Sequence, residues 1–305
     1  MSAKLIILGS GSALPTRSNF PTSQIFELRD KQFMIDCGEG TQIRMRQMGL
    51  KINRLGHIFI SHLHGDHCFG LIGLISSFGM LNRTAELYIH GPVGIQALFQ
   101  SQLDFFCNEL PFNLIFVEFN PGIHEVIYED RSLTVSTIPL KHRVPCAGFL
   151  FQEKPKNRHI KREMIDFYQI PLAYMNKIKN GEDYITEDGE TILNELLTSP
   201  AEKSVSYAYC SDTAYYESII PLIKEVDLLY HEATFEENEL LRAKSTLHST
   251  ASQAATIASL ANVKQLVIGH FSARYSNHKI LLKEAKQVFE NTVLATDMTE
   301  MPINA

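Results

Sequence analysis

The feature that most constrains the fold of this chain is the heptapeptide Ser61-His-Leu-His-Gly-Asp-His67. It directly follows an apolar strand pattern at Ile58–Ile60 and precedes a helical pattern at Gly70–Met80. Four of its side chains are potential metal ligands, because neutral imidazoles and carboxylates suit borderline cations such as zinc. A turn between a strand and a helix fixes the directions of such side chains at little entropic cost. The motif therefore predicts a metal site at the end of a strand.

Three further candidate ligands each follow an apolar strand pattern elsewhere in the chain. They are His142 after Leu133–Leu140, Asp212 after Val205–Cys210 and His270 after Val267–Gly269. Taken singly, each is more often an ordinary polar residue at the start of a loop. Ligands at strand ends can converge on one edge, however, and the heptapeptide already marks such an edge. The complete set of candidate ligands is His62, His64, Asp66, His67, His142, Asp212 and His270.

Short apolar, β-branched runs recur along the chain and alternate with patterns of helical period. Strands are expected at Leu5–Leu8, Gln24–Leu28, Phe33–Ile35, Ile58–Ser61, Glu86–Ile89, Leu114–Phe119, Leu133–Ile138, Val205–Tyr209, Leu228–Tyr230 and Gln265–Ile268. Helices are expected at Thr41–Met48, Gly70–Met80, Ile95–Phe106, Tyr215–Lys224, Ser249–Leu260 and His278–Phe289. Early hairpin-like pairs followed by strand and helix alternation predict an α/β fold with a mixed sheet packed by helices. We expect a single domain over residues 1–305.

Composition excludes several classes of protein. Of the 305 residues, 45% are apolar and 20% are charged, which is typical of a folded globular chain and not of a disordered or fibrous one. The formal charge of minus 6 gives no global basic field, so a polyanionic partner would have to meet a local patch. The five cysteines are odd in number and contain no CxxC, so neither a disulfide framework nor a cysteine metal site is expected.

The sequence gives no sign of export or of membrane insertion. The first apolar run, Leu5–Leu8, is too short for the core of a signal peptide. The longest one, Phe69–Leu81, is shorter than a membrane span. Because the cysteines show no disulfide pattern, the cytoplasm is the expected location, and no membrane partner is expected.

One segment departs from this rhythm of strands and helices. From Lys154 to Lys179 the chain is polar, contains two prolines and lacks a clean strand pattern, so we expect an inserted arm with approximate limits 152–203. Seven positive and two negative residues give the segment a charge of plus 5, which leaves about minus 11 for the rest of the chain. Because neutralisation of phosphates dominates affinity for RNA, the segment is a candidate RNA-binding arm. The alternative is a charged, solvent-exposed insertion that binds no ligand. The candidate RNA contacts are Lys154, Lys156, Arg158, Lys161, Arg162, Lys177 and Lys179.

Together these stretches resemble the ribonuclease Z family of the metallo-β-lactamase superfamily. The heptapeptide alone is common to the superfamily, whereas three other stretches point to this family: His231-Glu-Ala-Thr234, Leu247-His-Ser-Thr250 and Gly269-His-Phe-Ser-Ala-Arg-Tyr275. Further matches are Gly9-Ser-Gly-Ser-Ala-Leu-Pro-Thr16, Asp36-Cys-Gly-Glu-Gly-Thr41 and Phe69-Gly-Leu-Ile-Gly-Leu74. The resemblance implies an αββα sandwich with a protruding basic arm that grips the body of the tRNA.

The resemblance also implies an activity. A protein of this family is a zinc-dependent endoribonuclease that removes the 3′ trailer from precursor tRNA, leaving a tRNA 3′-hydroxyl and a 5′-phosphorylated trailer. One metal would be held by His62, His64 and His142, the other by Asp66, His67 and His270, and both by Asp212. Two Zn²⁺ ions per subunit, or Mn²⁺ in their place, would supply a metal-bound hydroxide that attacks phosphorus. Asp66 would accept the proton of the attacking water.

Two more expectations rest on the resemblance, and one departure from it stands out. Glu232 and His248 would deliver a proton to the leaving 3′ oxygen, although strand-end polarity and a helix cap are their plainer roles. The protein would be a homodimer in which the arm of one subunit presents tRNA to the active site of its partner. The chain departs from the family at the arm, where Leu172-Ala173 replaces the Gly-Pro that usually precedes a pattern matched here by Tyr174-Met-Asn-Lys-Ile-Lys179.

Other functions fit parts of the sequence. A phosphodiesterase of the same superfamily that acts on small diesters would share the metal site, but it would not need a basic arm. A protein that binds RNA through an inactive site should have lost ligands, and none of the seven is lost. Hydrolysis of a small ester or a β-lactam fits less well, because Asp66 and Asp212 suit phosphate chemistry and nothing predicts export.

Overall fold

The structure is a computed structural model, and it describes residues 3–304 of the chain. It divides into two compact units. One unit consists of the residues up to Gln152 together with Val205–Asn304, and the other consists of Glu153–Ser204. We call them the sandwich unit and the arm unit.

The first sheet of the sandwich unit has seven strands in the order β18-β1-β2-β3-β4-β5-β6. Their bounds are β1 (Ala3–Gly9), β2 (Ser23–Leu28), β3 (Lys31–Cys37), β4 (Leu55–Phe59), β5 (Leu87–Pro92), β6 (Leu114–Phe119) and β18 (Thr299–Ile303). Strands β3 to β6 are parallel neighbours, whereas β18, β1, β2 and β3 pair antiparallel. Because the parallel strands end at the same edge, the loop that follows β4 lies at that edge.

The second sheet also has seven strands, in the order β17-β16-β15-β14-β9-β8-β7. Their bounds are β7 (Val126–Glu129), β8 (Leu133–Pro139), β9 (Ala147–Glu153), β14 (Ser206–Cys210), β15 (Leu228–Glu232), β16 (Gln265–Gly269) and β17 (Thr292–Leu294). Strands β14 to β17 run parallel to one another, and β9 runs antiparallel to β14. The loops after β14, β15 and β16 therefore share one edge of this sheet.

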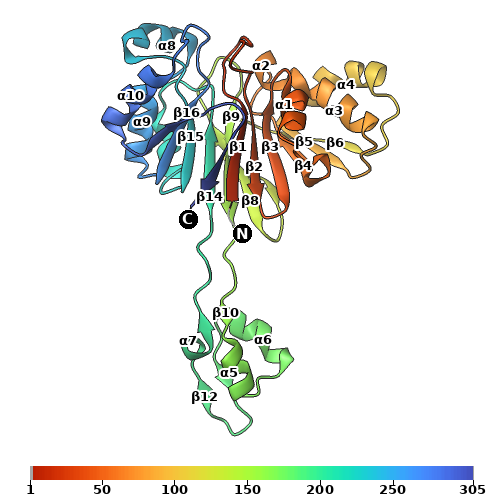
Figure 1. The fold of residues 1–305 in the computed structure, drawn as a ribbon, viewed down its shortest axis with the longest axis vertical. Coiled ribbons are helices and arrows are strands. Elements are labelled where there is room, and N and C mark those ends of the chain that lie inside the picture. The colour runs from red at the N-terminus through yellow and green to blue at the C-terminus, as the bar shows by residue number, and fades with distance from the viewer. Residues whose placement is uncertain (1–2, 305) are drawn as a thin grey trace. The chain divides into compact units, whose positions relative to one another are not determined.

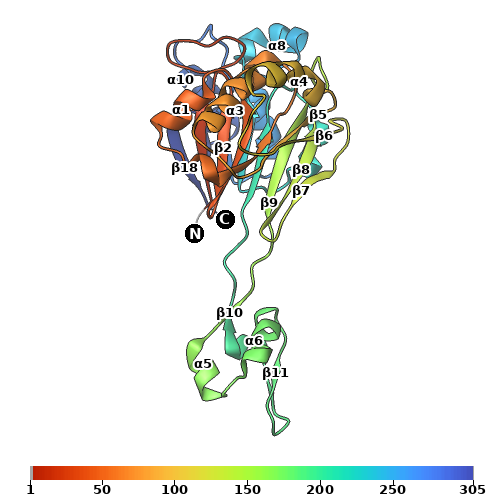
Figure 2. The ribbon, with the colours of Figure 1, turned by 90° about the vertical axis from the view of Figure 1, so that its right-hand side faces the viewer.

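The two sheets face each other, and helices cover both outer faces (Figure 1 and Figure 2). Phe26, Phe59, Phe149 and other buried side chains fill the space between the sheets. On the first sheet lie α1 (Thr41–Gln47), η1 (Ile52–Arg54), α2 (Gly65–Cys68), α3 (Gly70–Met80) and α4 (Ile95–Phe106). On the second lie η2 (Glu217–Leu222), α9 (Ala251–Leu260) and α10 (Lys279–Val288), while η3 (Glu237–Glu239) and α8 (Leu240–Thr246) come between β15 and α9. This arrangement confirms the predicted αββα sandwich.

Several elements differ from the sequence-based expectations. The predicted α-helix at Tyr215–Lys224 is wrong, because the segment forms the shorter 3₁₀-helix η2, which contains Pro221. Strands β7, β17 and β18 were not predicted, because their apolar runs are short or interrupted by polar residues, and β9 was missed although its residues 147–151 form an apolar run. Within residues 3–304, no helix combines the length and the apolar character needed to cross a membrane.

The arm unit has a small core of its own. Its elements are β10 (His159–Ile160), α5 (Arg162–Phe167), α6 (Leu172–Lys179), β11 (Tyr184–Ile185), β12 (Thr191–Ile192), α7 (Asn194–Leu197) and β13 (Thr198–Ser199). The core consists of Ile170, Ile178, Tyr184, Ile192 and Leu197. The buried Asn194 amide donates hydrogen bonds of 2.7 Å to the carbonyls of Ile178 and Glu182, which joins the start of α7 to the end of α6 and the turn that follows it.

The charge of the arm unit is divided between its two halves. Residues 154–179, which include α5 and α6, carry seven cations and two anions, a net charge of plus 5. Residues 180–204, which include the β11–β12 hairpin and α7, carry one cation and seven anions, a net charge of minus 6. With Glu153 the whole unit has a net charge of minus 2. Only the half that contains α5 and α6 is basic.

Candidate metal centre

The seven candidate ligands all lie at strand ends of the sandwich unit. His62 and His64 follow β4, and Asp66 and His67 belong to the short helix α2. His142 follows β8, Asp212 follows β14 and His270 follows β16. Each ligand thus sits where its strand leaves the sheet, and both sheets contribute ligands.

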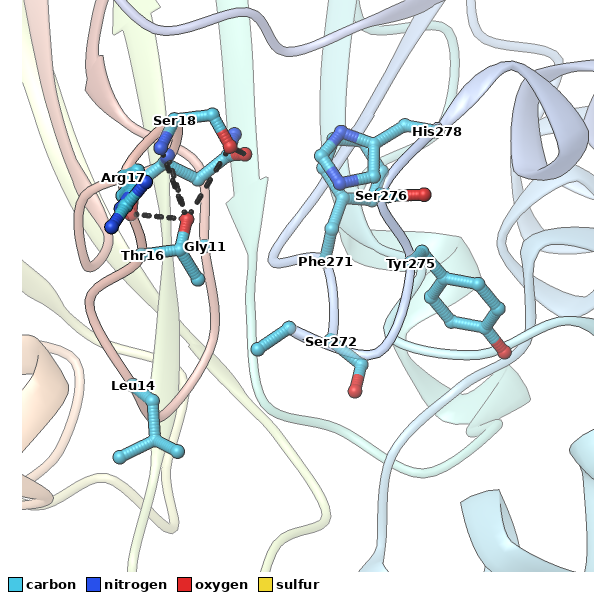
Figure 3. A pocket seen from close by; sticks show the side chains of 12 residues that line it. Gly11, Leu14, Thr16, Arg17, Ser18, Phe271, Ser272, Tyr275, Ser276 and His278 are labelled. Carbon is cyan, nitrogen blue, oxygen red and sulfur yellow. Dashed lines mark hydrogen bonds between the residues drawn. The ribbon is translucent and has the colours of Figure 1, made fainter.

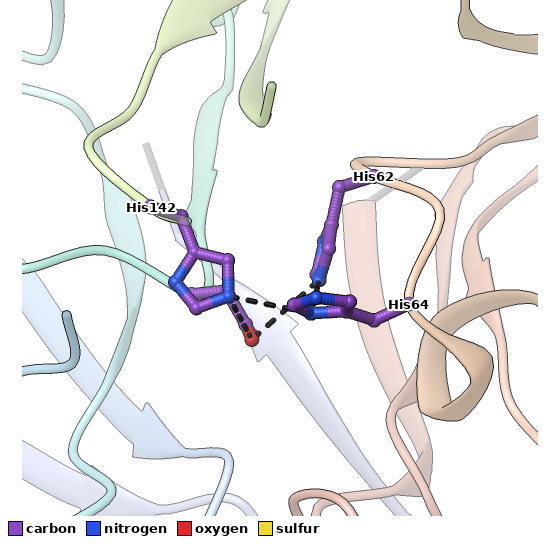
Figure 4. A group of neighbouring side chains, drawn as sticks. His62, His64 and His142 are labelled. Atoms are coloured by element: carbon purple, nitrogen blue, oxygen red, sulfur yellow. Dashed lines mark hydrogen bonds and ion pairs between the residues drawn. The ribbon is translucent and has the colours of Figure 1, made fainter. Parts of the chain in front are cut away.

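The first ligand group consists of His62, His64, His142 and Asp212 (Figure 4). One ligand atom from each of the four lies within 4.8 Å of the other three. His64 Nδ1 lies 2.9 Å from His62 Nε2 and 3.3 Å from His142 Nε2. Asp212 Oδ2 lies 3.6 Å from the Nε2 atoms of both His62 and His142. The three imidazoles and this oxygen surround a common point.

The second ligand group consists of Asp66, His67 and His270. Asp66 Oδ2 lies 3.6 Å from the Nε2 atoms of both histidines. Asp212 Oδ1 lies 3.1 Å from His67 Nε2 and 3.0 Å from His270 Nε2. The two carboxylate oxygens of Asp212 therefore face different ligand groups.

The nitrogen and oxygen atoms that face one another in the two ligand groups are suited to binding metal ions. His67 Nε2 and His270 Nε2 are buried and have no hydrogen-bond partner among the described residues, although buried nitrogens normally have one. Both point toward carboxylate oxygens of Asp66 and Asp212. Imidazole nitrogens and carboxylate oxygens are ligands of zinc and similar divalent cations. The unsatisfied nitrogens are the positions that a metal would bind.

The electrostatics of the centre favour a cation as well. Burial opposes protonation of His67, but Asp212, Asp36 and Asp66 outweigh it and hold the pKa of His67 well above its usual range. Burial and repulsion by His67 hold the pKa of His62 well below its usual range, so His62 is the neutral imidazole that binds metals. The carboxylates of Asp36, Asp66 and Asp212 thus stabilise a positive charge at a buried site.

Three backbone positions around the centre adopt left-handed conformations that non-glycine residues rarely use. The φ angles are +55° at Asp36, +52° at Asp212 and +59° at His270. Such conformations cost on the order of 1–3 kcal/mol each and persist where the surrounding structure imposes them. Here they turn the side chains at the ends of β14 and β16 toward the ligand groups.

The far nitrogens of the imidazoles are held by neighbouring groups. His142 Nδ1 lies 3.1 Å from the Leu247 carbonyl, and His270 Nδ1 lies 3.0 Å from Thr234 Oγ1. Asp36 holds His67 Nδ1 at 2.7 Å. Such partners fix the direction of a metal-binding ring.

Asp36 is a residue whose place at the centre sequence reasoning missed. In the sequence Asp36 is notable only as the first residue of a stretch that resembles the ribonuclease Z family. In the structure it is completely buried beside His67. An available signal was its position near the end of an apolar strand, like that of the predicted ligands. Nothing in the sequence, however, shows that it faces His67.

Glu232 and His248 form a pair next to the ligands. Their closest side-chain atoms, Glu232 Oε1 and His248 Nδ1, lie 2.8 Å apart. Burial opposes protonation of His248, but the Glu232 carboxylate outweighs it and raises the His248 pKa to about 9. The His248 ring lies 5.1 Å from that of His142 and 5.4 Å from that of His270, centroid to centroid. A protonated imidazole is thereby held beside both ligand groups.

A pocket of about 240 Å³ opens between the β1–β2 loop and the segment after β16 (Figure 3). Leu14, Thr16 and Arg17 line one side, and Ser272 and Tyr275 line the other. The two walls adjoin the ligands, because the Ala13 amide donates to Asp66 Oδ2 at 2.8 Å and the second wall begins one residue after His270. A substrate at the centre can extend into this pocket.

The seven candidate RNA contacts lie in the arm unit, apart from the ligands in the chain. Lys156 pairs with Glu153 at 3.2 Å, Arg158 donates to Thr198 Oγ1 at 2.7 Å and Lys161 donates to the Leu196 carbonyl at 3.0 Å. These three therefore help to hold the arm unit together. Lys177 lies on α6 with its Nζ 5.9 Å from the centroid of the Tyr174 ring.

Two facing sheets with His and Asp ligands at one edge define a protein of the metallo-β-lactamase fold. The structure matches that of human tRNase Z, short form, with a TM-score of 0.72 and 24% identity over 99% of this chain and 100% of that one. It also matches the metallo-β-lactamase fold protein YhfI from Bacillus subtilis, with a TM-score of 0.68 and 19% identity over 99% of this chain and 100% of that one. These likenesses confirm the fold.

Sequence comparison gives the family within this fold. Residues 3–159 match the family model described as Anti-Pycsar protein Apyc1. Ribonuclease Z of Bacteroides fragilis is 60% identical over 294 residues, which cover 96% of this chain and 97% of that protein. Ribonuclease Z of Bacteroides thetaiotaomicron is 56% identical over 301 residues, which cover 99% of this chain and 95% of that protein. The chain belongs to the ribonuclease Z family, as its motifs predicted, and is therefore a metal-dependent endoribonuclease.

Proposed function

We propose that this protein is a zinc-dependent endoribonuclease that removes the 3′ trailer from precursor tRNA. The products are a tRNA with a 3′-hydroxyl and a trailer with a 5′-phosphate. The observation that carries this proposal is the pair of ligand groups that share Asp212, in a chain 60% identical to a protein named Ribonuclease Z. Such an arrangement suits phosphodiester hydrolysis, in which the attacking and the leaving oxygen both need stabilisation.

Each ligand group would hold one metal ion. His62, His64 and His142 would bind the first, Asp66, His67 and His270 the second, and Asp212 both. Two divalent cations bound there would lower the pKa of a water molecule and stabilise the negative charge that develops on the phosphodiester. The many imidazoles favour zinc, and manganese is the alternative.

Asp66 would accept the proton of the attacking water. Its side chain is 12% exposed, whereas that of Asp212 is 3% exposed, so it is the ligand carboxylate that water and substrate reach more easily. The Ala13 amide donates to Asp66 Oδ2 and fixes the carboxylate. A fixed carboxylate beside the attacking oxygen is suited to general base catalysis.

His248 would donate the proton to the leaving 3′ oxygen. Glu232 keeps its imidazole protonated, and the backbone amide of Thr213 together with the Thr234 hydroxyl holds the Glu232 carboxylate at 2.8 Å and 2.6 Å. An alkoxide is a poor leaving group unless it is protonated. The 12% exposure of the His248 side chain allows it to reach the substrate.

The arm unit would bind the tRNA body through the half that contains α5 and α6. That half carries the net charge of plus 5, and the acidic half would face away from the RNA. Leu172, which replaces the usual glycine, is 82% exposed at the start of α6 and so lies on the surface of that half. This basic segment of residues 154–179 in a single metallo-β-lactamase-like domain is the proposed tRNA-binding arm.

The protein would act as a cytoplasmic homodimer. The family resemblance supports the dimer, and Phe105 and Phe106 at the end of α4 are exposed apolar side chains that a second copy could cover. All five cysteines are free, which fits a reducing compartment. Light scattering of the purified protein tests the dimer, and a monomeric mass would contradict it.

Cleavage of a labelled precursor tRNA by the zinc-loaded protein, with and without a chelator, tests the proposed function. We expect a chelator-sensitive cut just after the discriminator nucleotide that leaves a 3′-hydroxyl. An intact precursor together with rapid hydrolysis of a small diester would contradict it and favour a phosphodiesterase acting on small diesters.

A further inference from the structure

One hydrogen bond crosses the interior of the sandwich and reaches the partner of a metal ligand. The Tyr209 hydroxyl donates to Asp36 Oδ2 at 2.6 Å. Tyr209 belongs to β14 of the second sheet, whereas Asp36 belongs to β3 of the first. Both side chains are completely buried. The bond therefore connects the two sheets at the carboxylate that holds His67.

The other donors to Asp36 come from the first sheet. The Ser61 amide donates to Oδ1 at 2.8 Å, and the Ser61 hydroxyl and His67 Nδ1 lie 2.9 Å and 2.7 Å from Oδ2. Ser61 and His67 belong to the segment that follows β4. Among the described hydrogen bonds of Asp36, the one from Tyr209 is the direct tie to the second sheet, and the Ser61 carbonyl adds an indirect tie by accepting from the Ala147 amide of β9 at 3.1 Å.

This link matters because the second sheet supplies the shared ligand. Asp212 comes three residues after Tyr209, and its Oδ1 lies 3.1 Å from His67 Nε2. The His67 ring thus has one nitrogen on Asp36 and the other facing Asp212. The spacing of the two carboxylates decides whether His67 and Asp212 can bind the same metal ion.

We propose that Tyr209 is a positioning residue for the metal centre: its hydroxyl holds Asp36, and through it His67, at the spacing from Asp212 that a shared metal requires. The inference rests on the proposed metal binding. Partners of metal-binding imidazoles typically contribute about 10–100-fold to metal affinity. Because Tyr209 acts one bond further away, its hydroxyl contributes at the lower end of this range.

The sandwich offers two matched control residues. Tyr207 lies two residues earlier on β14 and donates to Gln24 Oε1 at 2.5 Å instead of to Asp36. Tyr230 stacks on Tyr209 with ring centroids 5.1 Å apart, and among the described residues no hydrogen bond joins its hydroxyl to Asp36 or to a candidate ligand. Both are completely buried, like Tyr209.

The test compares the Zn²⁺ affinities of the full-length wild type, Tyr209→Phe, Tyr207→Phe and Tyr230→Phe by competition with a chromophoric chelator. We expect Tyr209→Phe to weaken one of the two bound ions about tenfold. The two control variants should bind zinc with wild-type affinity. A wild type that binds no zinc would contradict the proposed function, whereas unchanged affinity in Tyr209→Phe would contradict only this inference.

A second measurement separates positioning from a loss of stability. Loading each protein with Co²⁺ gives a visible absorption spectrum that depends on the geometry of the ligands. We expect the spectrum to change in Tyr209→Phe alone, while thermal unfolding of the metal-free proteins shows losses in both Tyr209→Phe and Tyr207→Phe. Equal changes of spectrum or affinity in Tyr207→Phe would show a general effect of the interior and overturn the inference.

Discussion

The sandwich unit and the arm unit use polar residues in opposite ways. At the metal centre, buried side chains such as His67 and Asp212 are each fixed by several neighbours, and left-handed backbone conformations orient Asp212 and His270. In the arm unit the charged side chains lie around a core of only five buried apolar residues, and their signs are divided between two halves. Bond cleavage requires fixed atoms, whereas binding of a phosphate backbone requires charge of one sign in one place. Under the proposed function, the first unit performs the chemistry and the second contributes substrate affinity.

Removal of the shared carboxylate should have the largest effect. In Asp212→Ala both ligand groups lose an oxygen, so we expect loss of metal binding and a fall of at least about 10³-fold in kcat/KM for precursor tRNA and for a small diester alike. Metal content and both rates are the measurements. Asp227→Ala is the control, because Asp227 holds Ser206 at the opposite end of β14. Equal losses of metal content and of both rates in the two variants would contradict the role of Asp212 as the shared ligand.

Removal of the proposed proton donor should have a smaller effect that depends on the leaving group. We expect His248→Ala to lower kcat on precursor tRNA by about 10²-fold, because the leaving 3′ oxygen then departs unprotonated. A nitrophenyl phosphodiester should lose much less, since nitrophenolate is stable as an anion. Steady-state rates on both substrates check this, and equal losses would contradict the role of His248 as a general acid.

The halves of the arm unit should respond differently to a change of charge. Replacing Lys177 and Lys179 with glutamate should weaken tRNA binding by about tenfold. The slope of log K against log salt concentration should become less steep by about 2. Replacing Glu187 and Asp188 on the acidic half with glutamine and asparagine should leave affinity within about twofold. Binding titrations at several salt concentrations measure both. A stronger effect of the acidic half would place the RNA on the other side of the arm unit.

Restoring the family pattern at the arm should have the smallest effect. Leu172→Gly with Ala173→Pro changes two residues in the first turn of α6, where proline is tolerated. Exposed substitutions of this kind change free energies by about 0.5 kcal/mol, so tRNA affinity should change by less than about threefold. A larger gain in affinity would show that the glycine and proline themselves contact tRNA.

Each of the seven candidate ligands follows an apolar strand pattern in the sequence, so their convergence at one edge could be anticipated. The parallel strands β14, β15 and β16 end at that edge and bring Asp212, Glu232 and His270 together, but the role of Glu232 came from the family resemblance and not from strand patterns. The partners Asp36 and Tyr209 were not predictable in the same way. Their contact depends on which side chains face each other across two sheets, and one sequence carries no record of that pairing.

In the arm unit the basic segment was predicted from its charge, and the acidic residues 180–204 can be read from the sequence in the same way, whereas the core that the two halves share cannot. Residues 154–179 stand out by charge, but the acidic hairpin and α7 complete the same small core through Tyr184, Ile192 and Leu197. These apolar residues are few and lack a clear period, because two-residue strands are too short to show alternation. The packing of the two halves around one core therefore became visible only in the folded unit.

The most direct test of this division of labour is a variant without the arm unit. Gln152 and Ser206 pair directly across β9 and β14, so replacing residues 154–204 with Asn-Gly should close the two strands as a hairpin. We predict that this variant hydrolyses a small phosphodiester at the wild-type rate, while its kcat/KM for precursor tRNA falls at least about tenfold through KM. Equal loss of both activities in a folded variant that retains its metal would contradict the account, because the arm unit would then take part in the chemistry.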